Sequence, residues 1–356
     1  MRVRIVSYED VNAWILGKFA RRMNEELLKL GVDSDIANVP DPSADINHHL
    51  IFTYCMPEDL NSKDTLMVTH VDEISKSVRL KNQLKRASLG ICMSKGTMDE
   101  LIAIGIPADR LSFVNAAHDN VMRPRRTVIG ITSKVQPTGC KREEMIFELA
   151  ETLDPSLFEF VIMGSGWESI IASIRNLGIN VTYHDTFQYD KYVEIMPSFD
   201  YYLYTGQDEG SMGFIDALAA GVKTIVTPQG FHLDATNGIT HSFNTIEELK
   251  SIFGSISSER LKLLNAVADW TWKDYAIKHL ELWKHITGKG TVESQYKDGL
   301  NSLLNREPAE IDVKAYKKSL YNGSIRSYRH NGWRKMMRLG DPKWLMQKLR
   351  SQMKAK

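Results

Sequence analysis

Short apolar runs alternate with amphipathic stretches through the first 120 residues of the chain. The apolar runs have the length and composition of buried strands, and they fall at residues 3–7, 49–55, 65–71, 89–94 and 111–116. Apolar residues at four-residue spacing predict a helix that carries Ile15, Phe19, Met23 and Leu27 and ends before Gly31, and helical stretches follow near residues 80–86 and 96–104. This alternation predicts a doubly wound parallel sheet.

A second series of the same kind begins after the basic, proline-containing segment at residues 123–126. Its expected strands lie at residues 128–132, 158–163, 180–184, 201–204 and 224–226, and its expected helices lie at residues 143–153, 168–177 and 189–196. Two further helical stretches follow at residues 246–253 and 257–268. We therefore expect an α/β protein with two Rossmann-like parallel-sheet domains.

An aromatic-rich helix is expected over residues 270–286. Trp272, Ala276, Leu280 and Trp283 recur every three or four positions along it. Because this spacing places them on one helix face, we expect them to pack in a core rather than to stack on a ligand.

Length and composition are those of a globular protein with about two domains. The chain has 356 residues and a formal net charge of +1. Cys55, Cys92 and Cys140 are few and widely separated, which favours reduced thiols in a cytosolic protein over disulfides or a zinc site. Neither a signal peptide nor a membrane-spanning stretch is expected, so we expect a cytoplasmic protein.

The stretch at residues 201–227 reads as one strand, loop, helix and strand of a parallel sheet, and ligands bind at such a loop. Gly210 lets the backbone approach a ligand closely. The first amides of the helix, at Ser211, Met212 and Gly213, are expected to face an anion. Carboxylates one turn apart can hold sugar hydroxyls beside it. A phosphate on the helix start with hydroxyls on the acids is the arrangement that a nucleotide sugar needs.

The segment from Glu209 to Gly221 resembles the acidic E-x7-E signature of the retaining GT-B glycosyltransferases, the glycosyltransferase family 4 type. The resemblance extends over about residues 1–286. It implies two Rossmann-like domains that face a central cleft, with Glu209 on the donor hexose, Asp216 on the ribose and the backbone of Gly210 to Met212 on the diphosphate. Only six residues separate Glu209 from Asp216, so Asp208 is the alternative first acid.

Two cations, Lys134 and Lys141, lie in the loop that follows Gly130. Positive charge at this edge of a sheet would stabilise a leaving diphosphate more in the transition state than in the ground state. The resemblance implies that Lys134 stands where the family commonly has an arginine, that Lys141 is the family's second cation, and that no metal or other cofactor is needed. A solvated basic loop is the alternative explanation.

Three further features resemble the donor side of the family. Gly164 lies in a glycine turn after a strand and would allow close approach to the nucleotide, whereas Trp167 is expected to pack. Thr186 and Phe187 stand where the base-binding loop of the family would fall, although a helix N-cap at Asp185 or Thr186 explains these residues nearly as well.

On the first domain, His70 follows a strand and resembles the histidine that many family members place near the donor sugar. A structural role for it is the alternative. Glu9 and Asp10 lie in the loop where acceptors bind in this fold, and either could hold an acceptor hydroxyl. His70 and Asp72 lack a third ligand at a convincing spacing, so no metal site is expected.

The end of the chain is strongly basic. Residues 314–356 hold thirteen lysines and arginines against one acid, Asp341, which gives +12 and leaves 1 − 12 = −11 for the rest. A helix is expected from Asp341 and Pro342, and the basic amphipathic segment at residues 324–356 suggests binding at an anionic membrane surface, where Trp333, Met336 and Met337 could also insert. Packing on the acidic body of the protein is the alternative, and nucleic acid is the less favoured partner because no reading module is present.

We expect an N-terminal acceptor domain at residues 1–122, a nucleotide-sugar donor domain at residues 123–269, a helix at residues 270–288 that crosses back to the first domain, and a basic extension at residues 289–356. The expected activity is transfer of a sugar from a nucleoside-diphosphate sugar to a glycan or lipid-linked acceptor. The expected place is the cytoplasm, including the inner face of the membrane. A sugar-nucleotide epimerase of the same fold and a non-catalytic binding or scaffold relative are the alternatives.

Overall fold

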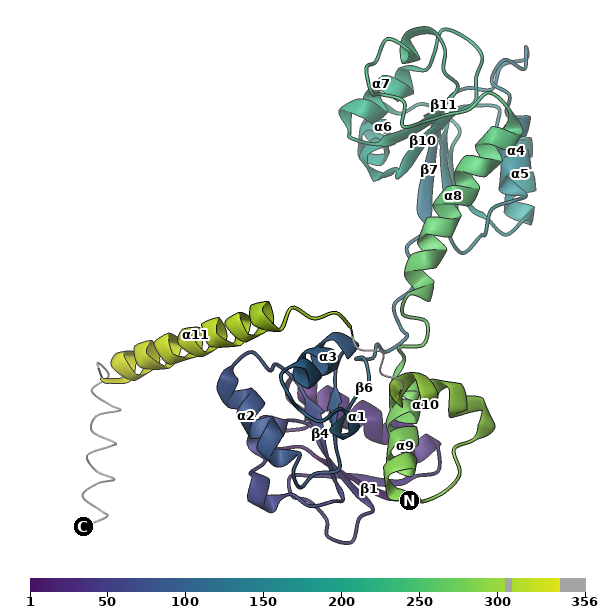
Figure 1. Ribbon diagram of the computed structural model, residues 1–356. Helices are drawn as coiled ribbons and strands as arrows, with labels where there is room; N and C mark the ends of the chain where they lie inside the picture. Colours follow the sequence, from purple (N-terminus) through teal and green to yellow (C-terminus); the bar gives the residue numbers. More distant parts are fainter. Residues whose placement is uncertain (305–308, 340–356) are drawn as a thin grey trace. The chain divides into compact units, whose positions relative to one another are not determined.

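The structure is a computed structural model that describes residues 1–304 and 309–339. The helix expected from Asp341 lies outside the described residues. The chain divides into two compact units, and the two are described separately below (Figure 1). Unit 1 combines residues 1–120 with the residues from 269 onward, and unit 2 comprises residues 121–268.

Unit 1 is built on a six-stranded parallel sheet with the strand order β2-β1-β3-β4-β5-β6. The strands are β1 (Arg2–Val6), β2 (Asp33–Ala37), β3 (Ile46–His49), β4 (Asp64–Val68), β5 (Leu89–Cys92) and β6 (Leu111–Phe113). The helices are α1 (Trp14–Lys29), α2 (Ile74–Gln83), α3 (Lys95–Ala103), α9 (Trp272–Thr287), α10 (Lys297–Leu304) and α11 (Val313–Leu339). Short 3₁₀ turns lie at η1 (Phe52–Tyr54), η2 (Pro57–Asp59), η3 (Ala108–Arg110) and η6 (Ser294–Tyr296).

Helix α9 belongs to the core of unit 1, although it lies far from the sheet in the sequence. Its Trp272, Ala276, Leu280 and Trp283 are buried beside Phe19 of α1. The indole N–H of Trp283 donates to the hydroxyl of Thr65 on β4, at 3.2 Å. The expectation that these four side chains pack in a core is confirmed.

Unit 2 has a second six-stranded parallel sheet, with the order β12-β11-β10-β7-β8-β9. Its strands are β7 (Thr127–Thr132), β8 (Phe158–Met163), β9 (Asn180–His184), β10 (Tyr201–Tyr204), β11 (Lys223–Val226) and β12 (His241–Ser242). Its helices are α4 (Glu144–Ala150), α5 (Glu168–Asn176), α6 (Tyr189–Ile195), α7 (Met212–Ala219) and α8 (Ile246–Asn265), with 3₁₀ turns η4 (Met196–Ser198) and η5 (Gly230–His232). The expected α/β class with two Rossmann-like parallel sheets is confirmed. The expected cleft between the two domains stays a prediction.

The structure corrects the expected strand at residues 49–55. Strand β3 ends at His49, and Phe52–Tyr54 forms a 3₁₀ turn. The hydrophobic pattern does not reveal β3, because three of its four buried residues are polar. His48 bonds the hydroxyl of Thr65 at 3.0 Å, and His49 bonds the carboxylate of Asp64 at 3.1 Å, so each buried ring has a polar partner.

Two edge strands and one helix also differ from the expectation. Strand β2 has the sequence DSDIA and β12 has only two residues, so neither shows an apolar run. The helices expected at residues 246–253 and 257–268 are one helix, α8. Gly254 does not interrupt it. No helix in the described part of the chain combines the length and apolar character needed to cross a bilayer.

Candidate functional site

Unit 2 contains a pocket of about 550 Å³ at the carboxyl edge of its sheet. The walls come from the loops that follow β7, β8, β9 and β10, and they consist of Thr132, Ser133, Lys134, Met163, Gly164, Ser165, Asp185, Thr186, Phe187, Tyr189, Tyr192, Ser211, Met212, Gly213 and Asp216. Seven of these residues are candidates from the sequence, namely Lys134, Gly164, Thr186, Phe187, Ser211, Met212 and Asp216. Loops far apart in the sequence therefore place them around one cavity.

Two glycines allow the pocket loops to approach one another. Gly164 has a φ of +138°, and a Cβ atom there would lie 2.1 Å from the carbonyl oxygen of Ser133. A Cβ atom at Gly213 would lie 2.3 Å from the hydroxyl of Thr132. Since no side chain fits at these distances, glycine at both positions lets the loop after β8 and the start of α7 close against the end of β7.

The start of α7 presents fewer unbonded amides than the sequence suggested. The amide N–H of Ser211 is not available to a ligand, because it donates to Nε2 of His232 at 2.9 Å. Met212 and Gly213 supply the next two amides, and no acceptor for either is found in the described residues. An anion at the helix start would therefore bind Met212 and Gly213, which corrects the expectation for the amide of Ser211.

The side chain of Ser211 is also bonded inside the unit. Its hydroxyl lies 2.6 Å from the phenol oxygen of Tyr202, which is fully buried on β10. Burial raises the pKa of Tyr202 to about 12, so this phenol stays protonated and acts as a hydrogen-bonding group. Tyr202 also accepts from the hydroxyl of Thr132 at 3.3 Å. These bonds fix the first turn of α7 against the sheet.

His232 is a residue whose role the sequence did not reveal. It is fully buried beneath the loop, with its ring centroid 4.3 Å from that of Phe214. Because Nε2 accepts the amide of Ser211, the proton lies on Nδ1, which donates to the carbonyl of Thr227 at 3.1 Å. Burial lowers the pKa of His232, which favours this neutral form. No sequence motif marks the contact, since it joins two loops 21 residues apart.

The two candidate cations have different surroundings. Lys134 lines the pocket and is exposed, and within the described residues it has no ion-pair partner. Lys141 does not line the pocket. Its ammonium group lies 2.6 Å from both the carboxylate of Asp208 and the phenol of Tyr204. The charge of Lys134 is therefore available to a ligand in this pocket, whereas that of Lys141 is neutralised by Asp208.

The two candidate first acids, Asp208 and Glu209, differ in their hydrogen-bond partners. The carboxylate of Asp208 accepts from Lys141, from Tyr204 and from the amide of Gly210. Burial raises the pKa of Asp208, but these bonds outweigh burial and the pKa falls below its ordinary value. Glu209 is exposed, and no partner for its carboxylate is found in the described part of the chain. Asp208 thus holds the loop, and Glu209 is the acid that a ligand could reach.

Asp216 lies one turn along α7 and lines the pocket. Its carboxylate accepts from the phenol of Tyr192 on α6 at 2.5 Å. This bond leaves lone pairs on the carboxylate, so Asp216 can still accept hydrogen bonds from sugar hydroxyls.

Arg142 is a second residue that the sequence did not single out. Its guanidinium donates to the carbonyl of Thr205 and the hydroxyl of Thr227, both at 2.6 Å, and to the carbonyl of Asn244 at 3.0 Å. It therefore ties the loop after β10 to the loop after β11. The neighbouring Lys141 is a candidate from the sequence, but no pattern in the sequence indicates that Arg142 is bonded inside the unit.

The loop after β9 supplies the aromatic side of the pocket. Phe187 is 64% exposed, and its ring centroid lies 5.2 Å from that of Tyr192. Asp185 and Thr186 line the same side. Trp167, by contrast, is fully buried and donates to the carbonyl of Ser133 at 2.7 Å, which confirms its expected packing role.

The remaining candidates belong to unit 1, at the carboxyl edge of its own sheet. His70 follows β4, is exposed, and has a φ of +46°, a conformation that non-glycine residues adopt only at a cost. Glu9 accepts from the phenol of Tyr54 at 3.4 Å, and Asp10 accepts from the amide of Asn12 at 2.9 Å. Asp10 therefore holds its own loop. In the described residues of both units, no group of three His, Cys, Asp or Glu side chains could hold a metal ion.

Comparison with known proteins gives no family assignment. No protein-family model matches the chain. No curated protein matches it either.

Among solved structures, the chain is similar to the lipopolysaccharide outer core galactosyltransferase WaaB in its apo form, with 12% identity, 78% of this chain and 97% of that chain covered, and a TM-score of 0.33. It is also similar to the sucrose-phosphate synthase from Thermosynechococcus elongatus, with 11% identity, coverage of 81% and 100%, and a TM-score of 0.35. A third is Anabaena Alr3699/HepE in complex with UDP and glucose, with 13% identity, coverage of 85% and 100%, and a TM-score of 0.31. At these scores the likeness carries no conclusion, and the fold class depends on the two strand orders.

Proposed function

We propose that this protein is a glycosyltransferase that moves a sugar from a nucleoside-diphosphate sugar to a glycan or lipid-linked acceptor. The observation that carries the proposal is the pocket of unit 2. It combines a cation that pairs with no described residue, the amide-bearing start of a helix, a carboxylate and an exposed aromatic ring. The cation and the helix start suit a diphosphate, the carboxylate suits a ribose, and the aromatic ring suits a base.

The phosphate end of the donor is proposed to bind between α7 and the loop after β7. Lys134 would pair with the diphosphate, and the amides of Met212 and Gly213 would donate to it at the positive end of the helix dipole. Negative charge grows on the diphosphate as the glycosidic bond breaks. A fixed cation and fixed amides therefore stabilise the transition state more than the ground state. This arrangement requires no metal ion, and metal independence is part of the proposal.

The nucleoside end is proposed to extend toward the loop after β9. Asp216 would accept from the ribose hydroxyls. The base would lie against the exposed ring of Phe187, with Thr186 beside it. Gly164 would leave room for the nucleotide, because no side chain projects from the turn after β8 at that point.

The sugar end depends on the acids and on unit 1. Glu209 would hold the donor hexose, because Asp208 is already bonded to Lys141. Lys141 would act through its ion pair with Asp208, which sets the shape of the loop that carries Glu209. On unit 1, His70 is proposed to approach the reacting sugar, and Glu9 or Asp10 to hold an acceptor hydroxyl. Retention of the anomeric configuration is part of the proposal and rests on the resemblance of the acidic segment.

A turnover assay with UDP-, GDP- and dTDP-sugars tests the proposal. We expect one of them to be hydrolysed slowly or transferred, and Lys134→Ala to lower kcat/KM about 10- to 100-fold, because it removes a charge-assisted bond to the diphosphate. Lys250→Ala is the matched control. Lys250 is a lysine on α8 that pairs with Glu148 at 3.9 Å and does not line the pocket.

The outcomes separate the alternatives. An isomerised sugar nucleotide without acceptor would identify an epimerase. Tight nucleotide binding without turnover would indicate a scaffold relative. Equal losses in Lys134→Ala and Lys250→Ala, or no nucleotide binding at all, would contradict the proposed site.

We propose a cytoplasmic location for the enzyme, at the inner face of the membrane when the acceptor is lipid-linked. The expected membrane segment at residues 324–356 is described only as far as residue 339.

A further inference from the structure

Helix α11 is unusual in its charge. Between Val313 and Leu339 it contains eight lysines and arginines and no aspartate or glutamate, a net charge of +8. Five of these cations, Lys314, Lys317, Lys318, Arg326 and Arg329, lie in the turns whose side chains are described, and all five are exposed. Like charges along one helix repel each other, and an external source of negative charge would relieve this repulsion.

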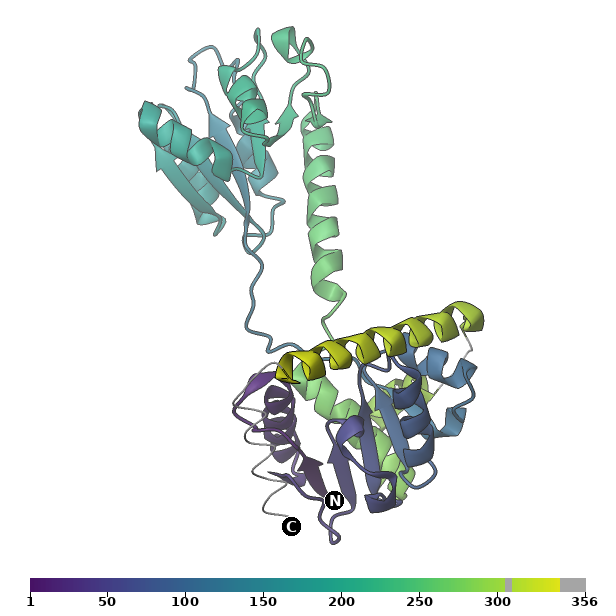
Figure 2. The same cartoon turned by 90° about the vertical axis from the view of Figure 1, so that its left-hand side faces the viewer.

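One face of α11 is fixed to unit 1. Leu320 is only 3% exposed, and the phenol of Tyr316 donates to the carbonyl of Val71 at 3.4 Å. The hydroxyl of Ser324 accepts from the amide of Ile74 at 3.1 Å. Helix α11 lies alongside α2 and α3 in both views (Figure 1 and Figure 2). It is therefore docked on the loop that follows β4, the loop that contains His70.

Gly323 fixes the rotation of the helix about its axis. A Cβ atom at this position would lie 1.9 Å from the carbonyl oxygen of Asp72, so only glycine permits the close approach. With Leu320 and Gly323 turned toward unit 1, the residues half a turn away must point to solvent.

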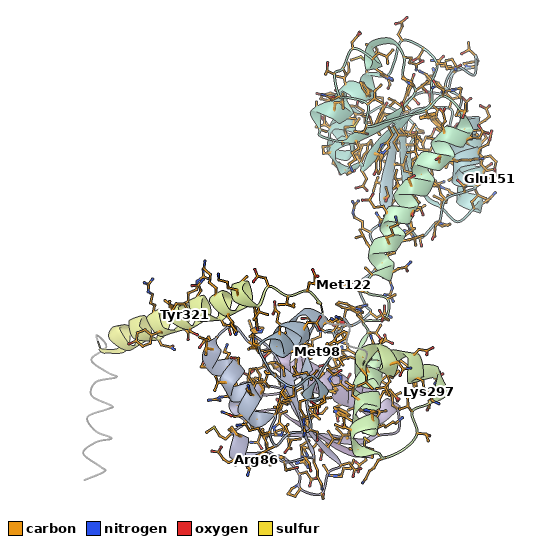
Figure 3. All side chains as sticks on the ribbon, in the orientation of Figure 1. Arg86, Met98, Met122, Glu151, Lys297 and Tyr321 are labelled. Atoms are coloured by element: carbon orange, nitrogen blue, oxygen red, sulfur yellow. The ribbon has the colours of Figure 1, made fainter. Side chains whose placement is uncertain are left out.

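The exposed side of α11 carries an apolar stripe. Tyr321 is 58% exposed, Ile325 is 36% exposed and Tyr328 is 83% exposed. They are spaced four and three residues apart, so they lie along one line of the helix surface (Figure 3 labels Tyr321). Lys314 lies on the same line about two turns before Tyr321, and Lys317 and Arg329 are exposed on its two sides. We call these six residues the α11 face.

The five described cations of α11 are not neutralised by described acids of the protein. None of the five described cations forms an ion pair with another described residue, although unit 1 offers 17 aspartates and glutamates before residue 121. A helix that had docked to satisfy its charge would have placed lysines against carboxylates. Instead the contact is made by Tyr316, Leu320 and Ser324 and leaves the charge outside.

We propose that the α11 face is a docking surface for an anionic membrane. Acidic headgroups would attract the lysines and arginines, and the two tyrosines and Ile325 would enter the interface, where amphipathic rings are favoured. The face overlaps the segment at residues 324–356 that was expected from the sequence, and it adds Lys314, Lys317 and Tyr321 before it.

The position of α11 on unit 1 also bears on which acceptor the enzyme uses. Because α11 is held against the loop after β4, a membrane bound to its outer face would lie near the carboxyl edge of the sheet in unit 1, where His70 is exposed. This consequence, unlike membrane docking itself, rests on the proposed transferase function. It assigns the acceptor to the class of glycans carried on a lipid in the bilayer.

Sedimentation of the full chain with vesicles tests the surface. We expect binding to vesicles of phosphatidylglycerol and phosphatidylcholine mixed 3:7, about tenfold or more above binding to phosphatidylcholine alone, and a decrease with added salt. Lys314→Ala combined with Lys317→Ala should lower binding by about tenfold or more, since each cation near an anionic surface contributes roughly a fivefold change. Tyr321→Ser combined with Tyr328→Ser should also lower it.

Matched controls change similar side chains elsewhere. Arg326→Ala removes one exposed charge on the other flank of α11, and Leu263→Ser removes an apolar side chain that is 71% exposed on α8. We expect Leu263→Ser to bind as the wild type does, and Arg326→Ala to lose less than Lys317→Ala alone. Thermal unfolding of each variant shows whether it is folded. Nucleotide binding is measured separately, so that failure of this inference is distinguished from failure of the proposed function.

Equal sedimentation with both kinds of vesicle would overturn the inference. Unchanged vesicle binding in both double variants would also overturn it. The same holds if only removal of residues 340–356 abolishes binding.

Discussion

Lys134 and Lys141 differ in their surroundings: Lys134 pairs with no described residue, whereas Lys141 has two polar partners. Lys134 and Lys141 come from the same loop, and the sequence treats them alike. The structure pairs Lys141 with Asp208 and Tyr204 and leaves Lys134 at the pocket. The number of cations could be predicted from the sequence. Their partners could not, because they lie more than 60 residues away on β10 and in the loop after it.

The partners of the acids Asp208 and Glu209 could not be predicted from the sequence either. The acidic segment after β10 was recognisable from its composition, and its place at a helix start followed from the strand and helix pattern. Which carboxylate stays unbonded depends on Tyr204 at the end of β10, whose phenol donates to Asp208 in the loop that follows. A strand residue and a loop residue four positions apart form this bond, which no periodicity predicts.

His232 leads to a prediction about pH. Burial lowers the pKa of this imidazole below its ordinary value of 6.5, so the folded protein holds it neutral while the unfolded chain protonates it near pH 6.5. Its contribution to stability is therefore complete above about pH 6.5 and is lost as the pH falls below that value. We expect His232→Gln, whose amide oxygen can still accept from Ser211, to lose less thermal stability than the wild type between pH 7 and pH 5.5.

His48 and His279 are buried in unit 1, and burial also lowers the pKa of each, so part of the pH dependence remains in the variant. Thermal unfolding of both proteins at the two pH values measures the difference. An equal loss in wild type and variant would show that His232 does not titrate with folding.

At the level of elements, the parallel sheets were more predictable than their edges. Runs such as residues 158–163 and 201–204 correspond to β8 and β10, because central parallel strands are buried on both faces and therefore apolar throughout. Strands β2 and β12 carry polar residues, because an edge strand has one side open to water. Strand β3 was misplaced because its two histidines are buried with partners.

The contact between α7 and β7 predicts a difference between two glycines in helices of unit 2. Gly213→Ala would place a methyl group 2.3 Å from the hydroxyl of Thr132 and 2.4 Å from that of Tyr202, so the helix start must shift. We expect a loss of about 1–3 kcal/mol in unfolding free energy. Nucleotide affinity should also fall, because the amides of Met212 and Gly213 move.

Gly254→Ala in α8 is the matched control. Nothing lies within 4 Å of its Cβ position, so we expect a gain of about 0.5–1 kcal/mol from the better helix propensity of alanine, with nucleotide affinity unchanged. Denaturant unfolding and nucleotide titration measure both quantities. A Gly213→Ala protein as stable as the Gly254→Ala protein would contradict the described approach of α7 to β7.

For the molecule as a whole, the two units have different predicted tasks. Unit 2 carries the pocket with its cation, amides, carboxylate and aromatic ring. Unit 1 carries His70 and the loop after β1 at the carboxyl edge of its own sheet, and α11 is docked on the loop after β4. The sequence predicted two sheets and their class, since that information lies in the hydrophobic pattern. It did not predict that α11 would turn a glycine face inward and a tyrosine face outward.

The central claim is that the pocket of unit 2 binds the nucleoside-diphosphate part of a sugar donor, and hydrogen–deuterium exchange of the full chain tests it most directly. UDP, GDP and dTDP are added in turn at saturating concentration. We predict that one of them protects the loops after β7, β8, β9 and β10, and that this protection is lost in Lys134→Ala and kept in Lys250→Ala. Protection confined to other segments, or none with any of the three nucleotides, would contradict the account.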